Sequence, residues 1–401
     1  MNPHLHMWLD LFQLLVYLPV GGAVLYFLAF AVLGIFYRQS TYPAAGSFRK
    51  RAVLIPAYRE DRVIVETARN ALLQEYPPED FEVIVIADTL QGETLRILRD
   101  MPVRVVEVAF EKSTKSKALN SAMAQLGDAF ELAVILDADN QMASDFLRKI
   151  NAFFTGDQIV VQGHRTAKNL DTSLAILDAV SEEINNHIFR KGHRVAGLSS
   201  AIIGSGMAFR YDFFREMMSG VDAVGGFDKD IELRMLSRGI RIGYLDDAWV
   251  FDEKVSRADA FSRQRRRWLS AQFHYFRRDI LKAIAALFTS GNADYFDKAL
   301  QFILPPRILL LGALILLSAV FGLWNLFAGN PALYNWIWLT TGILYAGSLL
   351  LSVPRRFYNR QTWKALAGIP RGMLLMVRSL AGIKGANREF IHTEHQVVKT
   401  K

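Results

Sequence analysis

Three long stretches of this sequence contain no charged side chain, and they constrain the fold more than any other feature. They are Leu11 to Tyr37, Ile308 to Phe327 and Tyr334 to Val353. Because a helix rises about 1.5 Å per residue, each stretch can cross a hydrocarbon core of about 30 Å. The first is too long for a secretory signal peptide, and no Lys or Arg precedes it. We therefore predict membrane-spanning helices at residues 11–37, 305–328 and 334–353.

The positions of Lys and Arg beside these stretches predict an orientation. Residues 1–10 contain neither, whereas a basic cluster that includes Arg49, Lys50 and Arg51 follows the first stretch. Lys and Arg gather on the cytoplasmic side of a membrane. We expect a multi-pass protein of the cell (inner) membrane, with an extracytoplasmic N-terminus at 1–10 and a cytoplasmic tail at 385–401. The net charge of +8 then indicates contact with anionic membrane lipids, and no nucleic acid is expected as a partner.

A different helix is predicted at residues 364–384. Apolar residues fall on one helical face, while Lys364, Arg371 and Arg378 recur every seven residues on the other. This pattern is typical of a helix that lies in the membrane interface, and a fourth span is the alternative. A second interfacial helix is predicted at 279–300. The sequence has no cysteine, which excludes disulfides and thiolate metal sites.

Between these segments, residues 48–278 alternate short apolar runs with helical patterns, as doubly wound α/β domains do. A helix is predicted from Val63 to Gln74, before Pro77 and Pro78, and another near Ala118. The predicted strands are Val53–Ile55, a run ending at Asp88, and the segments VRVVEVAF, LAVILDADN and QIVVQGH.

The fourth of these strands ends in two aspartates, Asp137 and Asp139. In open α/β sheets, ligands bind just beyond the carboxyl ends of the strands, and two carboxylates there are close enough to share a divalent cation. The alternative is a turn in which one Asp caps the next helix. Asp88 and Asp230 end other strands or loops, so the acidic residues predict one shared site.

Two basic segments predict contacts with phosphate. Lys112, Lys115 and Lys117 precede the helix near Ala118, and both lysines and helix N-termini favour phosphate groups. A solvated lysine loop is the alternative. In SRQRRRWLS, residues 262–270, arginines that can bind a diphosphate stand beside a tryptophan that can stack on a sugar. Here the alternative is a basic segment beside the membrane with an interfacial tryptophan.

In this order, the segments resemble membrane-bound members of glycosyltransferase family 2, which includes cellulose, chitin and hyaluronan synthases and ceramide glucosyltransferases. IPAYRE, KSKALN, DAD, GSG and QRRRW resemble family motifs, the last as Gln-x-x-Arg-Trp. FIHTEH, residues 390–395, resembles a segment of some polysaccharide synthases. The resemblance implies an α/β fold of the GT-A (Rossmann-like) class in the cytoplasmic domain, with flanking transmembrane helices.

The resemblance also assigns the site residues. It implies donor contacts by Pro56, Ala57, Tyr58, Glu60, Asp88, Lys115, Asp137, Arg265 and Arg267. It implies acceptor contacts by Gly204, Ser205, Gly206, Gln264 and Trp268, and Mg²⁺ or Mn²⁺ held by Asp139 with Asp137. Asp230 is the implied general base. Lys229 replaces the Glu or Thr that usually precedes the base, and Asp228 competes for that role. Ser205, His164 and Arg165 are expected to line the cleft, and a structural role is favoured for each of them.

The implied reaction is inverting transfer of a hexose from a nucleotide-diphosphate sugar, expected to be a UDP-sugar, to a hydroxyl group. Our first expectation is a growing polysaccharide as acceptor, as in exopolysaccharide or capsule synthesis. The alternative is transfer of one sugar to a membrane lipid such as ceramide, diacylglycerol or polyprenyl phosphate, which the small number of spans favours. A third reading, a nucleotide-binding scaffold without catalysis, conflicts with the presence of every expected acidic residue.

Overall fold

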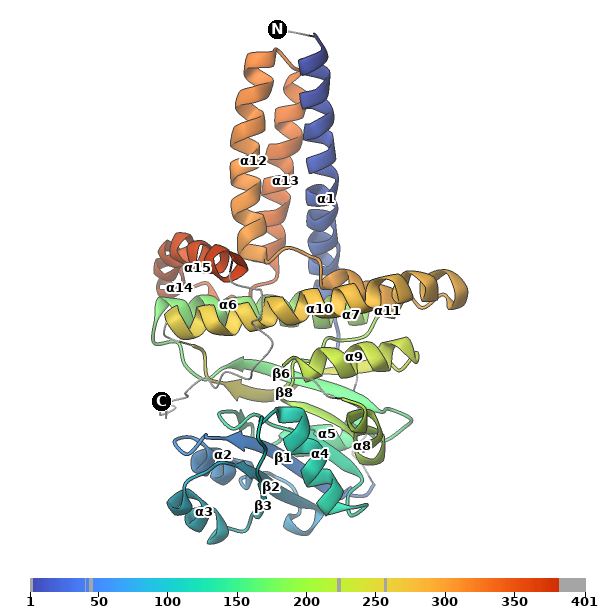
Figure 1. The fold of residues 1–401 in the computed structure, drawn as a ribbon, viewed down its shortest axis with the longest axis vertical. Coiled ribbons are helices and arrows are strands. Elements are labelled where there is room, and N and C mark those ends of the chain that lie inside the picture. Colours follow the sequence, from blue (N-terminus) through green and yellow to red (C-terminus); the bar gives the residue numbers. More distant parts are fainter. Residues whose placement is uncertain (1–2, 40, 43–45, 222–224, 256–257, 382–401) are drawn as a thin grey trace.

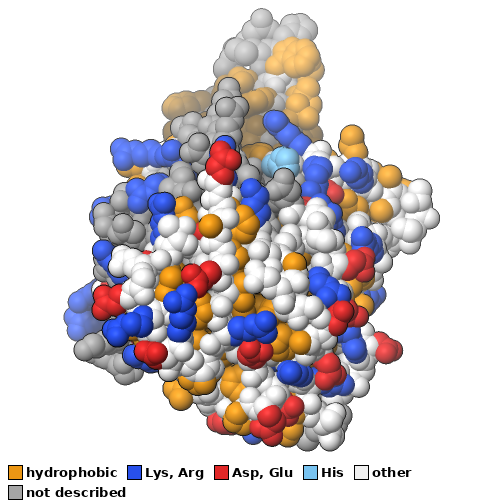
Figure 2. Space-filling view, turned by 60° about the horizontal axis from the view of Figure 1, so that its bottom comes forward, with side chains coloured by type: hydrophobic (Ala, Val, Ile, Leu, Met, Phe, Trp, Pro, Cys, Tyr) orange, Lys and Arg blue, Asp and Glu red, His pale blue; other side chains and the backbone are white. Residues whose placement is uncertain are grey.

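The computed structural model describes residues 3–381 except 40, 43–45, 222–224 and 256–257. Figure 1 shows three tiers: a bundle of long helices at the N-terminal end, a layer of helices that run across it, and a sheet covered by shorter helices. Figure 2 shows Lys, Arg, Asp and Glu side chains interspersed over the sheet tier, while hydrophobic side chains gather on the receding bundle.

One eight-stranded sheet organises the third tier, in the order β3-β2-β1-β4-β7-β6-β8-β5. The strands are β1 (Arg51–Tyr58), β2 (Phe81–Asp88), β3 (Arg104–Val108), β4 (Leu132–Ile135), β5 (Gln141–Met142), β6 (Val160–Ala167), β7 (Met207–Arg210) and β8 (Ile242–Asp252). Strands β1 to β4 are parallel to their neighbours in that group, whereas β7 runs antiparallel between β4 and β6. The carboxyl ends of β1, β2 and β4 therefore share one edge of the sheet.

The five strands predicted from the sequence are confirmed as β1, β2, β3, β4 and β6. The prediction missed the other three. Strand β7 has four residues and β5 has two, too short for a pattern to be read. Strand β8 contains Asp246 and Asp247 in its middle, which interrupt its apolar run.

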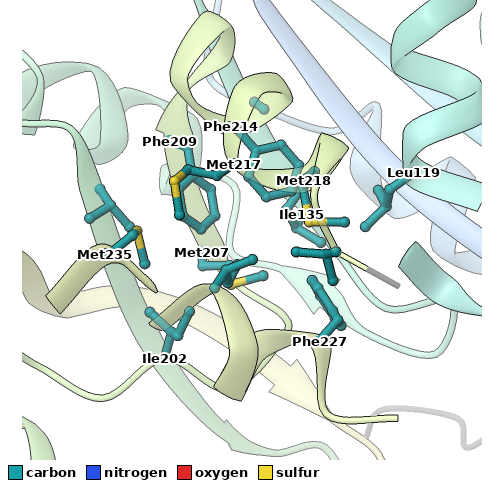
Figure 3. Close-up of a cluster of buried hydrophobic side chains, with 14 of the residues drawn as sticks. Leu119, Ile135, Ile202, Met207, Phe209, Phe214, Met217, Met218, Phe227 and Met235 are labelled. Carbon is teal, nitrogen blue, oxygen red and sulfur yellow. The ribbon is translucent and has the colours of Figure 1, made fainter. Parts of the chain in front are cut away.

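Helices cover both faces of the sheet, so the central strands are buried on both sides. These helices are α2 (Ile64–Ala71), α3 (Gly92–Arg99), α4 (Lys115–Leu126), α5 (Phe146–Phe153), α8 (Tyr211–Ser219) and α9 (Phe227–Ser237), with a 3₁₀ turn at Pro78–Asp80. Alternate residues of β1 pack on opposite faces: Leu54 joins a core with α4, α8 and α9, and Ile55 joins one with α2 and α5. Figure 3 shows part of the first core, which includes Ile202, Phe227 and Ile135, the last residue of β4.

The bundle contains α1 (Pro3–Ile35), α12 (Arg307–Ala328) and α13 (Ala332–Leu351), which lie side by side (Figure 1). Phe27, Leu310 and Tyr345 pack between them. Within the described residues, His6–Ile35 and Arg307–Ala328 are long and apolar enough to cross a membrane. All three predicted spans are thus helices. The third predicted span, α13, is less apolar because it carries polar residues such as Asn335. That α13 crosses a membrane stays a prediction.

Helices α10 (Ala258–Ser290) and α15 (Ile369–Ala381) run across the foot of the bundle (Figure 1). Also in this tier are α6 (Ser173–Asn185), a π-helix (Asn186–Gly192), α7 (His193–Val195), α11 (Ala293–Gln301), α14 (Arg360–Ala365), and 3₁₀ turns at Arg355–Phe357 and Leu366–Gly368. The predicted boundary at residue 278 falls inside α10, which is one continuous helix of 33 residues. The single helix predicted at 364–384 is divided, as far as residue 381, into the end of α14, the 3₁₀ turn at Leu366–Gly368 and α15.

Candidate active site

The carboxyl ends of β1 and β2 form one side of the site. Tyr58 and Asp88 are partners in the parallel register, and the Arg59 N–H donates to the Asp88 carbonyl oxygen at 3.1 Å. Arg59 and Thr89, which follow the two strands, have positive φ angles of 55° and 60°. Non-glycine residues held in this region are strained and cluster at ligand sites. The structure thus brings together the predicted donor residues of β1, Pro56 to Tyr58, with Asp88 and the following residues.

Lys115 connects the aspartate turn after β4 with the loop that contains Gly204. Its Nζ donates to Asp137 Oδ1 and, at 2.7 Å, to the carbonyl oxygen of Gly204. Helix α4 begins at Lys115, three residues before the predicted start, because Thr114 caps it by accepting from the Lys117 N–H. Lys115 therefore lies at a helix N-terminus beside the predicted metal carboxylate, an arrangement that favours the binding of phosphate groups.

The other two lysines of this segment do not share that position. Lys117 Nζ donates to the carbonyl oxygen of Lys112 at 3.2 Å, and Lys112 is exposed. The structure thus brings one of the three predicted phosphate lysines to the carboxylates.

The turn that carries the two aspartates is held by hydrogen bonds to the buried Ser205 side chain. The Asp137 N–H donates to Ser205 Oγ at 2.9 Å, and the Ser205 hydroxyl lies 2.6 Å from the Asn140 side-chain amide. With that amide oriented to satisfy its neighbours, it accepts from Ser205 and donates to Asp139 Oδ1 at 3.2 Å. Ser205 is fully buried. In this conformation it supports the aspartate turn, so its predicted contact with the acceptor stays a prediction.

Gly204 and Gly206 have φ angles of 80° and 62°, which favour glycine. A Cβ on Gly206 would meet Val250 at 3.0 Å. These glycines let the loop bring the Gly204 carbonyl oxygen to Lys115.

Asp137 and Asp139 fit a divalent cation as part of its ligand set. Both are carboxylates beyond one strand end, and Asp139 is buried with its carboxylate oriented by Asn140. Among the residues that the structure describes, no group of three or more His, Cys, Asp or Glu could hold an ion by itself. Mg²⁺ commonly takes one or two carboxylates and completes its coordination with substrate phosphates and water. The predicted Mg²⁺ or Mn²⁺ site is therefore one that a nucleotide diphosphate would complete.

A buried network of charges lies behind Asn140, and Arg165 is the member of it for which the sequence predicts a role, a structural one. Asn140 also donates to Asp252 at 3.1 Å, Lys254 Nζ lies 2.7 Å from Asp252, and Arg165 pairs with Glu182 at 3.1 Å. Burial alone would raise the pKa of Asp252, but Arg165 and Lys254 hold that pKa below its usual value. The network keeps Asp252 ionised as an acceptor for Asn140. His164, expected near the cleft, bonds Asp246 at 2.9 Å in a comparable structural role.

The two acidic residues of α9 have different surroundings. Asp230 is 3% exposed, and its two oxygens accept from Arg234 Nε at 2.9 Å and from Arg278 Nη1. Asp228 is half-buried, and its side chain lies 3.7 Å from the position that a Cβ on Gly204 would occupy. The structure therefore places Asp228 against the loop that Lys115 contacts, whereas the oxygens of Asp230 are occupied by guanidinium groups.

The QRRRW segment lies near the start of α10. Arg265 forms an ion pair with Asp178 on α6, and its guanidinium lies 4.5 Å from the Trp268 ring. Burial and the neighbouring Arg263 lower the pKa of Arg267. Gln264 Oε1 is buried without a hydrogen-bond donor among the described residues. The pair uses Nη2 of Arg265, so the predicted contact with a diphosphate would have to use the other N–H groups of this guanidinium or replace the pair. The pairing has no local sequence signal, because 87 residues separate the partners.

The sequence matches one protein family and several known proteins. Residues 49–271, more than half of the chain, match the family described as Glycosyltransferase like family 2. The chain is 25% identical over 247 residues to beta-monoglucosyldiacylglycerol synthase of Trichormus variabilis, covering 58% of this chain and 50% of that protein. It thus spans about half the length of that relative. It is 23% identical over 338 residues to Probable glycosyltransferase YdaM of Bacillus subtilis, covering 78% and 77%.

Among solved structures, the mannosyltransferase PcManGT from Pyrobaculum calidifontis, in complex with GDP-Man and Mn²⁺, aligns over 85% of this chain and 96% of that chain. The TM-score is 0.53 at 20% identity, which shows a shared fold. The α/β fold predicted for the sheet tier is thus confirmed as GT-A-like. With its family match spanning β1 to the first turns of α10, the chain belongs to glycosyltransferase family 2.

Proposed function

We propose that this protein transfers one sugar from a nucleotide-diphosphate sugar to a membrane lipid, with diacylglycerol as the first acceptor to test. The observation that carries the proposal is the meeting of Lys115, the Asp137–Asp139 turn and Asp228 at one sheet edge of a chain that also has an apolar helix bundle. The relatives named monoglucosyldiacylglycerol synthases favour the lipid acceptor over our first expectation of a polysaccharide. FIHTEH, which supported the polysaccharide, lies outside the described residues.

In the proposed reaction the acceptor hydroxyl displaces the nucleotide diphosphate from the anomeric carbon with inversion. Asp88 and the end of β1 would bind the nucleoside. Lys115 would stabilise the negative charge that develops on the leaving diphosphate. Asp137 and Asp139 would hold Mg²⁺ or Mn²⁺, which supplies Lewis-acid stabilisation of the same charge when bound.

We propose Asp228 as the general base that takes the acceptor proton. Both carboxylate oxygens of Asp230 are engaged by arginines, so Asp230 has fewer lone pairs to offer a hydroxyl group. Asp228 of α9 lies beside Gly204, and the carbonyl oxygen of Gly204 accepts from Lys115 Nζ. This choice revises the sequence-based assignment of Asp230 and keeps the general-base mechanism.

The membrane position remains a proposal that the bundle supports. With α1 and α12 in the bilayer, the layer formed by α10, α14 and α15 would lie at the membrane surface, where Leu281, Trp363 and Leu374 expose apolar side chains. The active site would then lie on the side of this layer that faces the cytoplasm.

Replacing Trp268 by Ala is expected to raise the KM for the lipid acceptor about tenfold, equivalent to about 1.4 kcal/mol. Trp268 is 37% exposed, and its ring lies beside the Arg265 guanidinium. Donor binding should change little. The measurement is the initial rate against acceptor and donor concentrations in mixed micelles, and equal losses for both substrates would contradict an acceptor role.

The experiment that tests the function uses the detergent-purified full chain with Mn²⁺, radiolabelled UDP- and GDP-sugars, and micelles that contain diacylglycerol or ceramide. Label that enters the organic phase as one glycolipid supports the proposal and identifies the donor. Label in a polymer that glycosidases digest would restore the polysaccharide reading. Nucleotide binding without either product would support a scaffold. The Asp228→Asn variant is the control for catalysis.

A further inference from the structure

Helix α11 is short, but its polar side chains connect four parts of the structure. Asp294 accepts from the Ser199 N–H at 2.8 Å, Tyr295 donates to Asp279 on α10 at 2.6 Å, and Asp297 accepts from Tyr26 on α1 at 2.7 Å. Lys298 pairs with Glu232 on α9, with Nζ and Oε1 2.9 Å apart. Helix α11 thus links the bundle to the two chain segments that border the active site.

The pair formed by Lys298 and Glu232 is buried, with 4% and 2% exposure. The same Glu232 oxygen accepts from the Ile202 N–H at 3.1 Å. Glu232 follows Asp228 by four residues, so both lie on one face of α9. Glu232 therefore bonds α9, on the face that carries Asp228, to the segment that leads into Gly204.

Other contacts fix the far side of this segment. Gln162 on β6 accepts from the Ile203 N–H at 3.1 Å and donates to the carbonyl oxygens of Ser205 at 2.9 Å and Gly206 at 3.1 Å. Figure 3 shows Ile202 and Phe227, the neighbour of Asp228, in the same apolar core. The loop is thus held to the sheet by Gln162 and to α9 by Glu232.

We propose that Glu232 is a positioning residue for the transfer reaction: it sets the distance between Asp228 and the loop 202–206, while Lys298 of α11 neutralises it. The proposal rests on the proposed function. A buried ion pair is weak evidence of stabilisation, because desolvation offsets much of the attraction. The hydrogen bond from the Ile202 N–H to Glu232 is directional, so it can fix the position of the loop relative to α9.

Two double variants separate position from charge, and both avoid a buried unpaired charge. In Glu232→Gln with Lys298→Met, the amide oxygen still accepts from Ile202. In Glu232→Met with Lys298→Met, that acceptor is lost. We expect the first variant to keep kcat within about threefold of the wild type and the second to lose about 100-fold, with the dissociation constant for nucleotide diphosphate and Mn²⁺ unchanged in both.

Hydrogen exchange of the peptide 199–206 gives a readout that needs no activity. Exchange should be about tenfold faster in the variant with Glu232→Met than in the variant with Glu232→Gln, which should match the wild type. Equal protection in the two variants would overturn the inference even if the wild type transferred no sugar. Equal kcat in the two variants, or a joint loss of nucleotide binding and Tm, would also overturn it. Absence of transfer by the wild type would refute only the proposed function.

Discussion

Replacing Asp228 by Asn is expected to reduce sugar transfer about 10³-fold while the dissociation constant for the nucleotide diphosphate stays within threefold of the wild type. General-base catalysis contributes about 10²–10⁴-fold, and Asn keeps the size of the side chain without its basicity. The carboxyl carbon of Asp228 lies 3.7 Å from the position that a Cβ on Gly204 would occupy, whereas Lys115 Nζ donates to Asp137 and to the Gly204 carbonyl oxygen. Initial rates of transfer, together with calorimetric titration of UDP or GDP, measure the two quantities.

The matched control is Asp230→Asn, which lies two residues further along α9. It removes the negative charge that Arg234 and Arg278 share, so we expect a lower Tm and a smaller loss of transfer than in Asp228→Asn. The reverse order, with near-normal transfer in Asp228→Asn and about 10³-fold loss in Asp230→Asn, would return the base role to Asp230.

The sequence predicts the segment of the proposed base but not which carboxylate is available within it. The motif around Lys229 predicts the segment that would carry the base, but the motif does not decide between Asp228 and Asp230. The decision depends on Arg278, which reaches Asp230 from α10 across 48 residues of sequence. Such a long-range pair has no local pattern. Lys115 and Asp137 were predicted individually, and the structure adds that they contact each other.

Some elements of the fold were likewise predicted from the sequence, and others were missed. The buried parallel strands were predicted, because a strand covered on both faces must be continuously apolar. Strand β8 was missed because Asp246 interrupts its apolar pattern. Asp246 pairs with His164 and Lys191, and these tertiary contacts stabilise a charged residue in the middle of the strand. The length of α10 was also missed, since its basic first half and apolar second half give different local patterns although they form one helix.

Replacing Asp139 by Asn is expected to weaken the binding of Mn²⁺ in the presence of a nucleotide diphosphate about 100-fold and to reduce transfer at least as much. Asp139 is the buried member of the aspartate pair, and the protein already orients its carboxylate through Asn140. Asn retains one oxygen but loses the charge that a hard divalent cation requires. Electron paramagnetic resonance of free Mn²⁺ measures the affinity without any need for activity.

The conservative comparison is Ser205→Ala, which leaves both carboxylates in place. It removes the acceptor for the Asp137 N–H and the hydroxyl beside Asn140, so we expect Mn²⁺ affinity to fall about tenfold, through orientation alone. A graded loss, larger in Asp139→Asn than in Ser205→Ala, would assign Asp139 to the metal and Ser205 to its support. Normal Mn²⁺ affinity in Asp139→Asn would instead favour the alternative that the sequence left open, in which these aspartates only shape the turn after β4.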